Sequence, residues 1–166
     1  MRQRLYVACA PVFFAIFFIA GCAAPPRASA PNQSDISPWR GRLSVRVESD
    51  QAQSFAAGFE LTGTPLAGEL TLYTPLGNTV AALSWSSQTA AMRSNGDVRY
   101  FESLDALIKQ ALGTEIPVAA LFAWLAGDNM TAAGWRADLS QHGDGRITAR
   151  RSDPAPAAEL RLVLEK

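Results

Sequence analysis

The sequence predicts a mostly β domain, in which a curved antiparallel sheet of short strands is interrupted by two short helices. From residue 39 onward, short segments alternate apolar and polar residues, the pattern of strands with one buried face. Turn-forming residues separate these segments at regular intervals, as in an antiparallel meander. Two segments in the middle of the chain place their apolar residues at helical spacing instead.

Residues 1–21 have the features of a signal peptide and are left out of the predicted fold. Arg2 and Arg4 precede an apolar run from Leu5 to Ile19. The alternative is a transmembrane helix, but such a helix needs roughly 20 consecutive apolar residues. Export therefore fits the segment better than membrane spanning.

The lipid attachment site is predicted at Cys22. Ile19-Ala20-Gly21-Cys22 follows the pattern of a lipobox, the motif that lipoprotein signal peptidase recognises. We expect cleavage before Cys22 and a covalent N-acyl and S-diacylglycerol lipid on this residue. Under the common sorting rule, an Asp after the lipidated cysteine retains a lipoprotein at the inner membrane. Ala23 therefore indicates the periplasmic face of the outer membrane.

Residues 22–38 are predicted to be a tether and residues 39–166 the folded domain. The tether contains Ser and Ala between four prolines, at positions 25, 26, 31 and 38. Pro-rich linkers are extended and semi-rigid, at about 3.1 Å per residue. The tether can thus hold the domain some distance from the bilayer.

Charge and cysteine content exclude several classes of function. The chain has 15 basic and 15 acidic residues, and loss of Arg2 and Arg4 leaves 13 basic ones. A nucleic-acid partner is not expected, because it would require a basic excess. Cys9 lies in the signal peptide and Cys22 carries the lipid, so no thiol remains for a disulfide, a metal or catalysis. No cofactor other than the covalent lipid is expected.

Nine segments have the alternation of half-buried strands. In the first of them, for example, Leu43, Val45 and Val47 share one face. The predicted strands are Gly41–Glu48, Ser54–Leu61, Gly68–Tyr73, Thr79–Trp85, Thr89–Arg93, Val98–Tyr100, Trp135–Leu139, Gly145–Arg151 and Glu159–Leu164.

Two helices are predicted between the sixth and seventh strands. Ser103 is a favourable N-cap for the first, whose apolar stripe ends at Leu112, and Gly113 is a favourable stop. Pro117 suits the first position of the second helix, which Gly127 ends.

No catalytic centre is evident in the sequence. The only histidine, His142, lies among turn-forming residues and is interpreted as a solvated turn residue. Neither a cluster of metal ligands nor a Gly-rich phosphate loop is present. An envelope hydrolase would need only two carboxylates, but nothing in the sequence singles out a pair.

The apolar residues of the sheet and helices allow two interpretations. Periodicity alone favours an ordinary packed core, and the alternative is a sheet curled around a cavity that holds a lipid. Leu76 lies near the tip of a turn, with Pro75 before it and Gly77 after it. A solvent-exposed leucine is common in proteins. Insertion into a membrane would contribute ~1.5–3 kcal/mol, which adds usefully to a lipid anchor but cannot replace one.

Four segments of the chain resemble the LolB family. They are Trp39-Arg40-Gly41-Arg42-Leu43-Ser44-Val45-Arg46, Leu72-Tyr73-Thr74-Pro75-Leu76-Gly77-Asn78-Thr79, Leu112-Gly113-Thr114-Glu115-Ile116-Pro117-Val118 and Leu121-Phe122-Ala123-Trp124-Leu125-Ala126-Gly127. Proteins of this family are outer-membrane lipoproteins that accept other lipoproteins from a periplasmic carrier and insert them into the outer membrane. The chain departs from the family in its C-terminal segment, residues 141–166, which is short.

The resemblance implies a half-open antiparallel β-barrel that encloses an apolar cavity under a helical lid. It implies the anchor at Cys22 and contact between lipid and the loop of Pro75, Leu76 and Gly77. The residues that would line the acyl-chain cavity are Val45, Val47, Phe59, Leu61, Leu72, Leu121, Trp124 and Leu125. The implied partners are a LolA-like carrier, cargo lipoproteins and outer-membrane phospholipid, and the protein is expected to be a monomer without enzymatic activity. The alternative is an accessory envelope lipoprotein with a solid core.

Overall fold

The computed structural model of the protein describes residues 38–49 and 52–165. The predicted signal peptide, Cys22 and residues 23–37 of the predicted tether lie outside the described residues. Among the helices of the described residues, none has both the length and the apolar character needed to cross a membrane.

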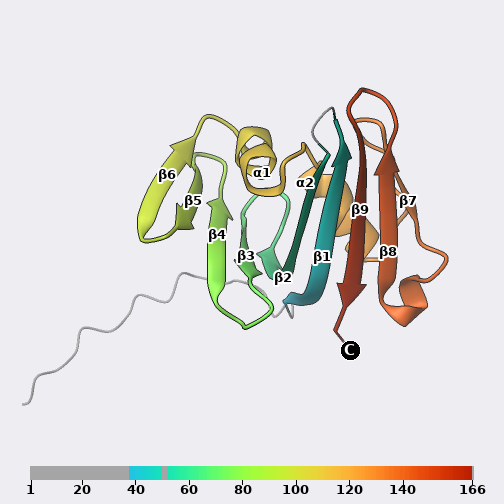
Figure 1. Cartoon of the computed structure of the whole chain (residues 1–166), viewed down its shortest axis with the longest axis horizontal. Helices are drawn as coiled ribbons and strands as arrows, with labels where there is room; N and C mark the ends of the chain where they lie inside the picture. Colours follow the sequence, from blue (N-terminus) through green and yellow to red (C-terminus); the bar gives the residue numbers. More distant parts are fainter. Residues whose placement is uncertain (1–37, 50–51, 166) are drawn as a thin grey trace, which may run out of the picture. The chain divides into compact units, whose positions relative to one another are not determined.

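Nine antiparallel strands form one sheet in the order β6-β5-β4-β3-β2-β1-β9-β8-β7 (Figure 1). The strands are β1 Trp39–Glu48, β2 Gln53–Gly63, β3 Gly68–Tyr73, β4 Thr79–Trp85, β5 Ala90–Ser94, β6 Asp97–Phe101, β7 Trp135–Asp138, β8 Arg146–Arg151 and β9 Ala157–Leu164. All nine predicted strands are therefore present. β3 and β4 have the predicted bounds, and the other strands differ from prediction by one or two residues at one or both ends.

β1 lies in the interior of the sheet, because β2 pairs with one of its edges and β9 with the other. Val45, for example, lies opposite Phe55 of β2 and Leu160 of β9. β6 and β7 are the two ends of the sheet, so within the described residues the sheet is open and does not close into a barrel. The expected mostly β, antiparallel fold is confirmed. The last strand in the sequence, β9, pairs with the first, β1.

One face of the sheet is buried and the other faces solvent. In β1, the side chains of Leu43, Val45 and Val47 are buried, whereas those of Arg42 and Arg46 are exposed. The alternation follows from the geometry of a strand, in which successive side chains point to opposite faces. The buried face is called the inner face below, and the solvent face the outer face.

Two helices lie against the inner face (Figure 1). The first, α1, spans Leu104–Leu112 and begins as predicted, because the Ser103 hydroxyl accepts a hydrogen bond from the Ala106 amide at 3.1 Å. It ends at Gly113, whose φ of 80° is in the left-handed region that glycine adopts without strain.

The second helix, α2, spans Val118–Leu125. Pro117 was predicted at its first position, but this residue has an extended backbone (φ −63°, ψ 113°) and precedes the helix as its N-cap. This shift of one residue loses no hydrogen bond. The amides at the start of a helix have no intrahelical partner, and proline has no amide hydrogen to leave unpaired. A single turn of 3₁₀ helix, η1, spans His142–Asp144 between β7 and β8.

Candidate functional site

The space between the inner face and the helices is apolar. α1 contacts β4, β5 and β6. One void in this space has a volume of about 10 Å³, which is room for roughly one water molecule. Its walls come from β1, β2, β3 and β9 and from both helices with their linker: Leu43, Phe59, Leu61, Leu70, Leu112, Ile116, Leu121, Leu160 and Leu162.

A larger and more open pocket of about 380 Å³ lies beside this void. It is bounded by the C-terminal end of α1 and by β1 and β2: Val45, Val47, Gln53, Ser54, Phe55, Ala111, Leu112 and Gly113. Leu112 lines both spaces, and only 3% of its surface is exposed. The side chain of Leu112 therefore separates the open pocket, called the mouth below, from the interior void.

The eight residues named from the family resemblance as cavity residues are all buried. Phe59, Leu61 and Leu121 line the void, and Val45 and Val47 line the mouth. The other three, Leu72, Trp124 and Leu125, line neither of these two spaces and are part of the packed core. The structure thus brings the predicted residues together in one buried apolar cluster.

Two buried tryptophans support the second helix and the segment after it. The ring centres of Trp124 and Trp135 are 6.4 Å apart with the rings tilted by 51°. Each indole nitrogen donates a hydrogen bond to a backbone carbonyl, from Trp124 to Met130 at 2.7 Å and from Trp135 to Glu115 at 2.9 Å. Both polar atoms are thus paired, as buried indole nitrogens usually are.

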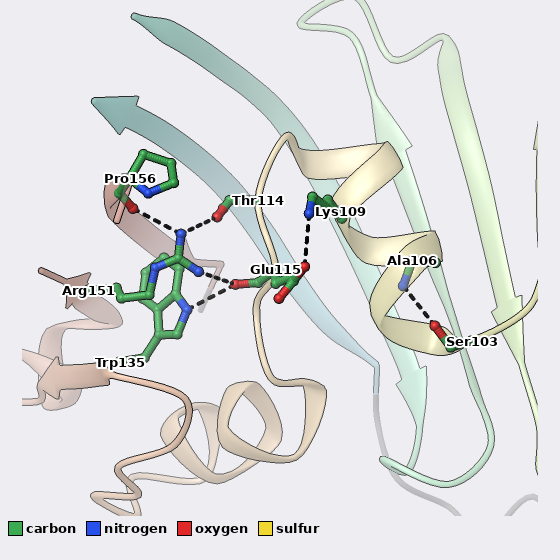
Figure 2. A network of polar contacts seen from close by, with 8 residues as sticks. All are labelled: Ser103, Ala106, Lys109, Thr114, Glu115, Trp135, Arg151 and Pro156. Carbon is green, nitrogen blue, oxygen red and sulfur yellow. Dashed lines mark hydrogen bonds and ion pairs between the residues drawn. The ribbon is translucent and has the colours of Figure 1, made fainter. Parts of the chain in front are cut away.

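A buried arginine fastens the linker between the helices to the end of the sheet (Figure 2). Arg151 of β8 donates hydrogen bonds to the Thr114 hydroxyl at 3.0 Å, the Glu115 carbonyl at 3.4 Å and the Pro156 carbonyl at 3.0 Å. Its Nε atom is buried without a hydrogen-bond partner. The charge is solvated mainly by dipoles of the linker, so the position of Arg151 depends on the linker remaining in place.

Sequence reasoning did not find Arg151 as a structural residue, although a signal was present. The alternation of β8 places residue 151 on the same face as Ile147 and Ala149, which are both buried. Charge argues against burial of an arginine. Here two of the three acceptors that offset this cost belong to residues more than thirty positions away in the chain.

His142 lies in a turn, as predicted, but its side chain is not fully solvated. The residue is half-buried, and its Nε2 atom lies 3.0 Å from the carbonyl oxygen of Leu125 at the end of α2. Its ring also lies beside Gly127, where an added Cβ would be 3.1 Å from the ring. His142 therefore ties η1 to the end of α2.

The loop of Pro75, Leu76 and Gly77 forms a closed turn between β3 and β4. The Gly77 amide donates to the Thr74 carbonyl at 2.9 Å, and the Thr74 amide donates to the Asn78 carbonyl at 2.8 Å. The φ of Gly77 is 83°, and nothing lies within 4 Å of the position of a Cβ there. Leu76 is 89% exposed, so a rigid turn holds an apolar side chain in solvent.

No group of three or more His, Cys, Asp or Glu residues suited to a metal ion is found among residues 38–49 and 52–165. Several carboxylates with a lowered pKa lie at surface ion pairs. The hydrogen bond from Arg40 lowers the pKa of Glu60, and that from Lys109 lowers the pKa of Glu115. Such pairs hold charge at the surface and do not form a catalytic pair.

The sequence of the chain is similar to those of known proteins. The sequence model of the family described as "Outer membrane lipoprotein LolB" matches residues 38–154. The outer-membrane lipoprotein LolB of Bordetella pertussis is 30% identical over 92% of this chain and 89% of its own length. That of Ralstonia nicotianae is 34% identical over 73% of this chain and 58% of its own length.

The chain belongs to the LolB family, whose model covers both helices, the loop of Leu76 and eight of the nine strands. The Bordetella relatives are named outer-membrane lipoproteins. The outer membrane is accordingly the location of this protein.

Proposed function

We propose that this protein accepts lipoproteins from a LolA-like periplasmic carrier and inserts them into the outer membrane. Membership of the LolB family over most of the described domain is the observation that carries this proposal. We also propose the division into a signal peptide (1–21), a lipidated tether (22–38) and the folded domain (39–166). Cys22 is the proposed anchor, and its tether would span about 50 Å at 3.1 Å per residue.

The mouth is the proposed entry for the acyl chains of the cargo. Its walls include Val45, Val47 and Phe55, and Leu112 separates it from the interior. An acyl chain would displace Leu112 and occupy the space between the inner face and the helices, so the helices would have to move away from the sheet. We therefore propose that α1, α2 and their linker act as the lid, with Arg151 holding it in the closed arrangement.

The chemistry of such a site suits cargo of many sequences. Burial of apolar surface is non-directional, and each methylene removed from water contributes ≈ 0.8 kcal/mol. An apolar site therefore binds any acyl chain without reading the attached protein. Displacement of Leu112 and opening of the lid oppose binding, which keeps the affinity low enough for release. No nucleotide and no catalytic step is part of the proposal, and the protein would act as a monomer.

Transfer between purified components tests this function. The chain from residue 22 to 166 with Cys22→Ser keeps the whole described domain and removes the anchor. It is mixed with a carrier loaded with a labelled lipoprotein, and phosphatidylcholine vesicles are then added. We expect the label to move first to this protein and then to the vesicles. If the label never leaves a carrier from the same organism, the proposal is wrong, and an accessory lipoprotein with a solid core becomes the better account.

A further inference from the structure

The outer face of the sheet carries an excess of arginine on β1, β7, β8 and β9. Seven exposed arginines belong to this surface, which we call the arginine face: Arg40, Arg42, Arg46, Arg136, Arg146, Arg150 and Arg161. The whole chain has equal numbers of basic and acidic residues. The arginine face therefore arises from segregation of charge onto one side of the sheet and is not visible in the composition.

Five exposed or half-exposed carboxylates lie on or beside this surface: Glu48, Glu60, Asp138, Glu159 and Glu165. The seven arginines therefore leave a positive excess of two. Arg40 pairs with Glu60 at 2.9 Å, and Arg150 and Arg161 share the carboxylate of Glu159, each at 2.7 Å. Burial alone would raise the pKa of Glu159, but the hydrogen bonds from both arginines outweigh it and lower the pKa. The remaining arginines form no ion pair with any described residue: Arg42, Arg46, Arg136 and Arg146.

An apolar residue lies among the unpaired arginines. Val163 of β9 is opposite Arg42 of β1 on one side and Arg146 of β8 on the other. It is 47% exposed. Neighbouring strands are ≈ 4.8 Å apart, so the two arginine backbones lie about 10 Å apart with the valine between them. This arrangement offers two guanidinium groups around an apolar floor.

The exposed leucine turn borders the same surface. A groove of about 260 Å³ has Arg40 and Arg42 among its lining residues on the outer face, together with Pro75 and Gly77 of the turn. The carboxylates of Glu60 and Glu165 also line this groove, and Glu60 is paired with Arg40. Leu76 stands between these two turn residues. The apolar tip and the cationic side chains therefore belong to adjacent parts of the surface, and β1, which carries Arg40 and Arg42, is also the strand that the tether enters.

We propose that the arginine face binds the headgroups of anionic phospholipids in the leaflet that carries the anchor. The inference rests on the proposed function, because it requires a protein that works at a membrane. Guanidinium groups bind phosphate through two parallel hydrogen bonds. Cationic side chains around exposed apolar residues are also the composition of surfaces that bind at the bilayer interface. An acidic protein partner would not account for Leu76 and Val163 beside the arginines.

Vesicle binding of the unanchored chain, residues 22–166 with Cys22→Ser, tests the proposal. The variant Arg42→Gln/Arg146→Gln removes two unpaired arginines, and Arg93→Gln/Arg99→Gln on β5 and β6 is the control with the same change in charge. The vesicles are phosphatidylcholine alone or an equal mixture with phosphatidylglycerol. Each basic residue near an anionic surface changes binding roughly fivefold, which corresponds to about 1 kcal/mol.

We expect Arg42→Gln/Arg146→Gln to weaken binding to the mixed vesicles on the order of twentyfold, and high salt to do the same. The control variant should bind within about twofold of the parent chain, because its arginines lie at the far end of the sheet. Circular dichroism and the midpoint of thermal unfolding show whether both variants fold as the parent does.

Three results would overturn the proposal. The first is equal weakening by both variants, and the second is equally tight binding to phosphatidylcholine alone. The third is unchanged vesicle binding with loss of cargo uptake from the carrier, which would assign the arginine face to the carrier protein. Failure of the proposed function gives a different result from failure of this proposal. In that case neither the parent chain nor any variant takes cargo from the carrier, but binding to vesicles still depends on phosphatidylglycerol.

Discussion

Arg151 and Trp135 converge on one backbone oxygen. The guanidinium carbon of Arg151 lies 5.5 Å from the ring centre of Trp135, and both side chains donate to the carbonyl of Glu115. The two residues are opposite each other in β7 and β8. The short linker between α1 and α2 is thus held against the end of the sheet by one cation and one indole ring, both buried.

Replacement of Arg151 by methionine should destabilise the protein and loosen this linker. Methionine fills much of the volume but leaves the buried Thr114 hydroxyl and the Pro156 carbonyl without their donor. An unsatisfied buried polar group costs ≈ 1–3 kcal/mol, so we expect a loss of about 2–4 kcal/mol in the free energy of unfolding. Urea denaturation measures this loss, and hydrogen exchange should quicken at residues 113–117.

Arg150→Met is the matched control for this prediction. Arg150 is the neighbouring residue, its side chain is 60% exposed, and its ion pair with Glu159 is at the surface. Exposed pairs contribute about 0–1 kcal/mol. Equal losses in the two variants would show that the linker is held by other contacts.

Truncation of Leu112 should join the mouth to the interior void. We expect Leu112→Ala to lose about 2–5 kcal/mol of stability, as buried leucines do. An apolar fluorescent probe or a fatty acid should bind more tightly, because the space it enters no longer needs to be vacated. Titration of the probe, followed by its emission, measures the change.

Leu107→Ala is the control that distinguishes a specific effect at the mouth from general weakening of the core. Leu107 is also fully buried on α1 but lines neither the mouth nor the void. It should lose similar stability without gaining affinity for the probe. If both variants bind the probe equally well, Leu112 is not the residue that separates the two spaces.

Acid should weaken the fold through its surface carboxylates. The hydrogen bond from Arg40 lowers the pKa of Glu60 below its usual value of 4.5, and the hydroxyl and amide of Ser140 lower the pKa of Asp138 below 3.8. The unfolded chain then binds more protons than the folded one between the two pKa values. The contribution to stability is therefore complete above the unfolded value and is lost as the pH falls through the folded one.

The midpoint of urea unfolding, measured from neutral pH to below pH 4, checks this prediction. It should be level near neutrality and decline in the acid range. High salt should reduce the decline, because exposed pairs are screened. Glu60→Gln should reduce it as well, because it removes the carboxylate that accepts from Arg40.

The strands and helices were predictable because their signals are local. Alternation identifies β3 and β4 to the residue, and the side chain of Ser103 and the backbone freedom of Gly113 define both ends of α1. These features need no knowledge of distant parts of the chain. The turn geometry around Leu76 belongs to the same class, because Pro75 and Gly77 determine it.

The remaining features depend on residues far apart in the sequence. Pairing of β1 with β9 leaves no local trace, since any half-buried strand could occupy that position. The contact between His142 and the Leu125 carbonyl depends on the path of the chain after α2. The degree of filling of the interior depends on how all side chains pack together. Periodicity reveals which residues face inward but not how much space remains between them.

Leu76→Glu should take cargo normally but deliver it poorly. Insertion of one leucine contributes ~1.5–3 kcal/mol, so its loss should slow transfer to vesicles roughly tenfold or more. Leu66→Glu is a demanding control, because Leu66 is 81% exposed in the turn at the opposite end of β3, roughly 20 Å away along the strand. Both substitutions are at exposed turns, so stability should change by less than about 0.5 kcal/mol.

Equal delivery by the two variants, measured with a labelled lipoprotein and vesicles, would rule out a special role for Leu76. Slower delivery by Leu76→Glu alone would mean that this end of the sheet approaches the bilayer, the end at which the groove beside Arg42 lies.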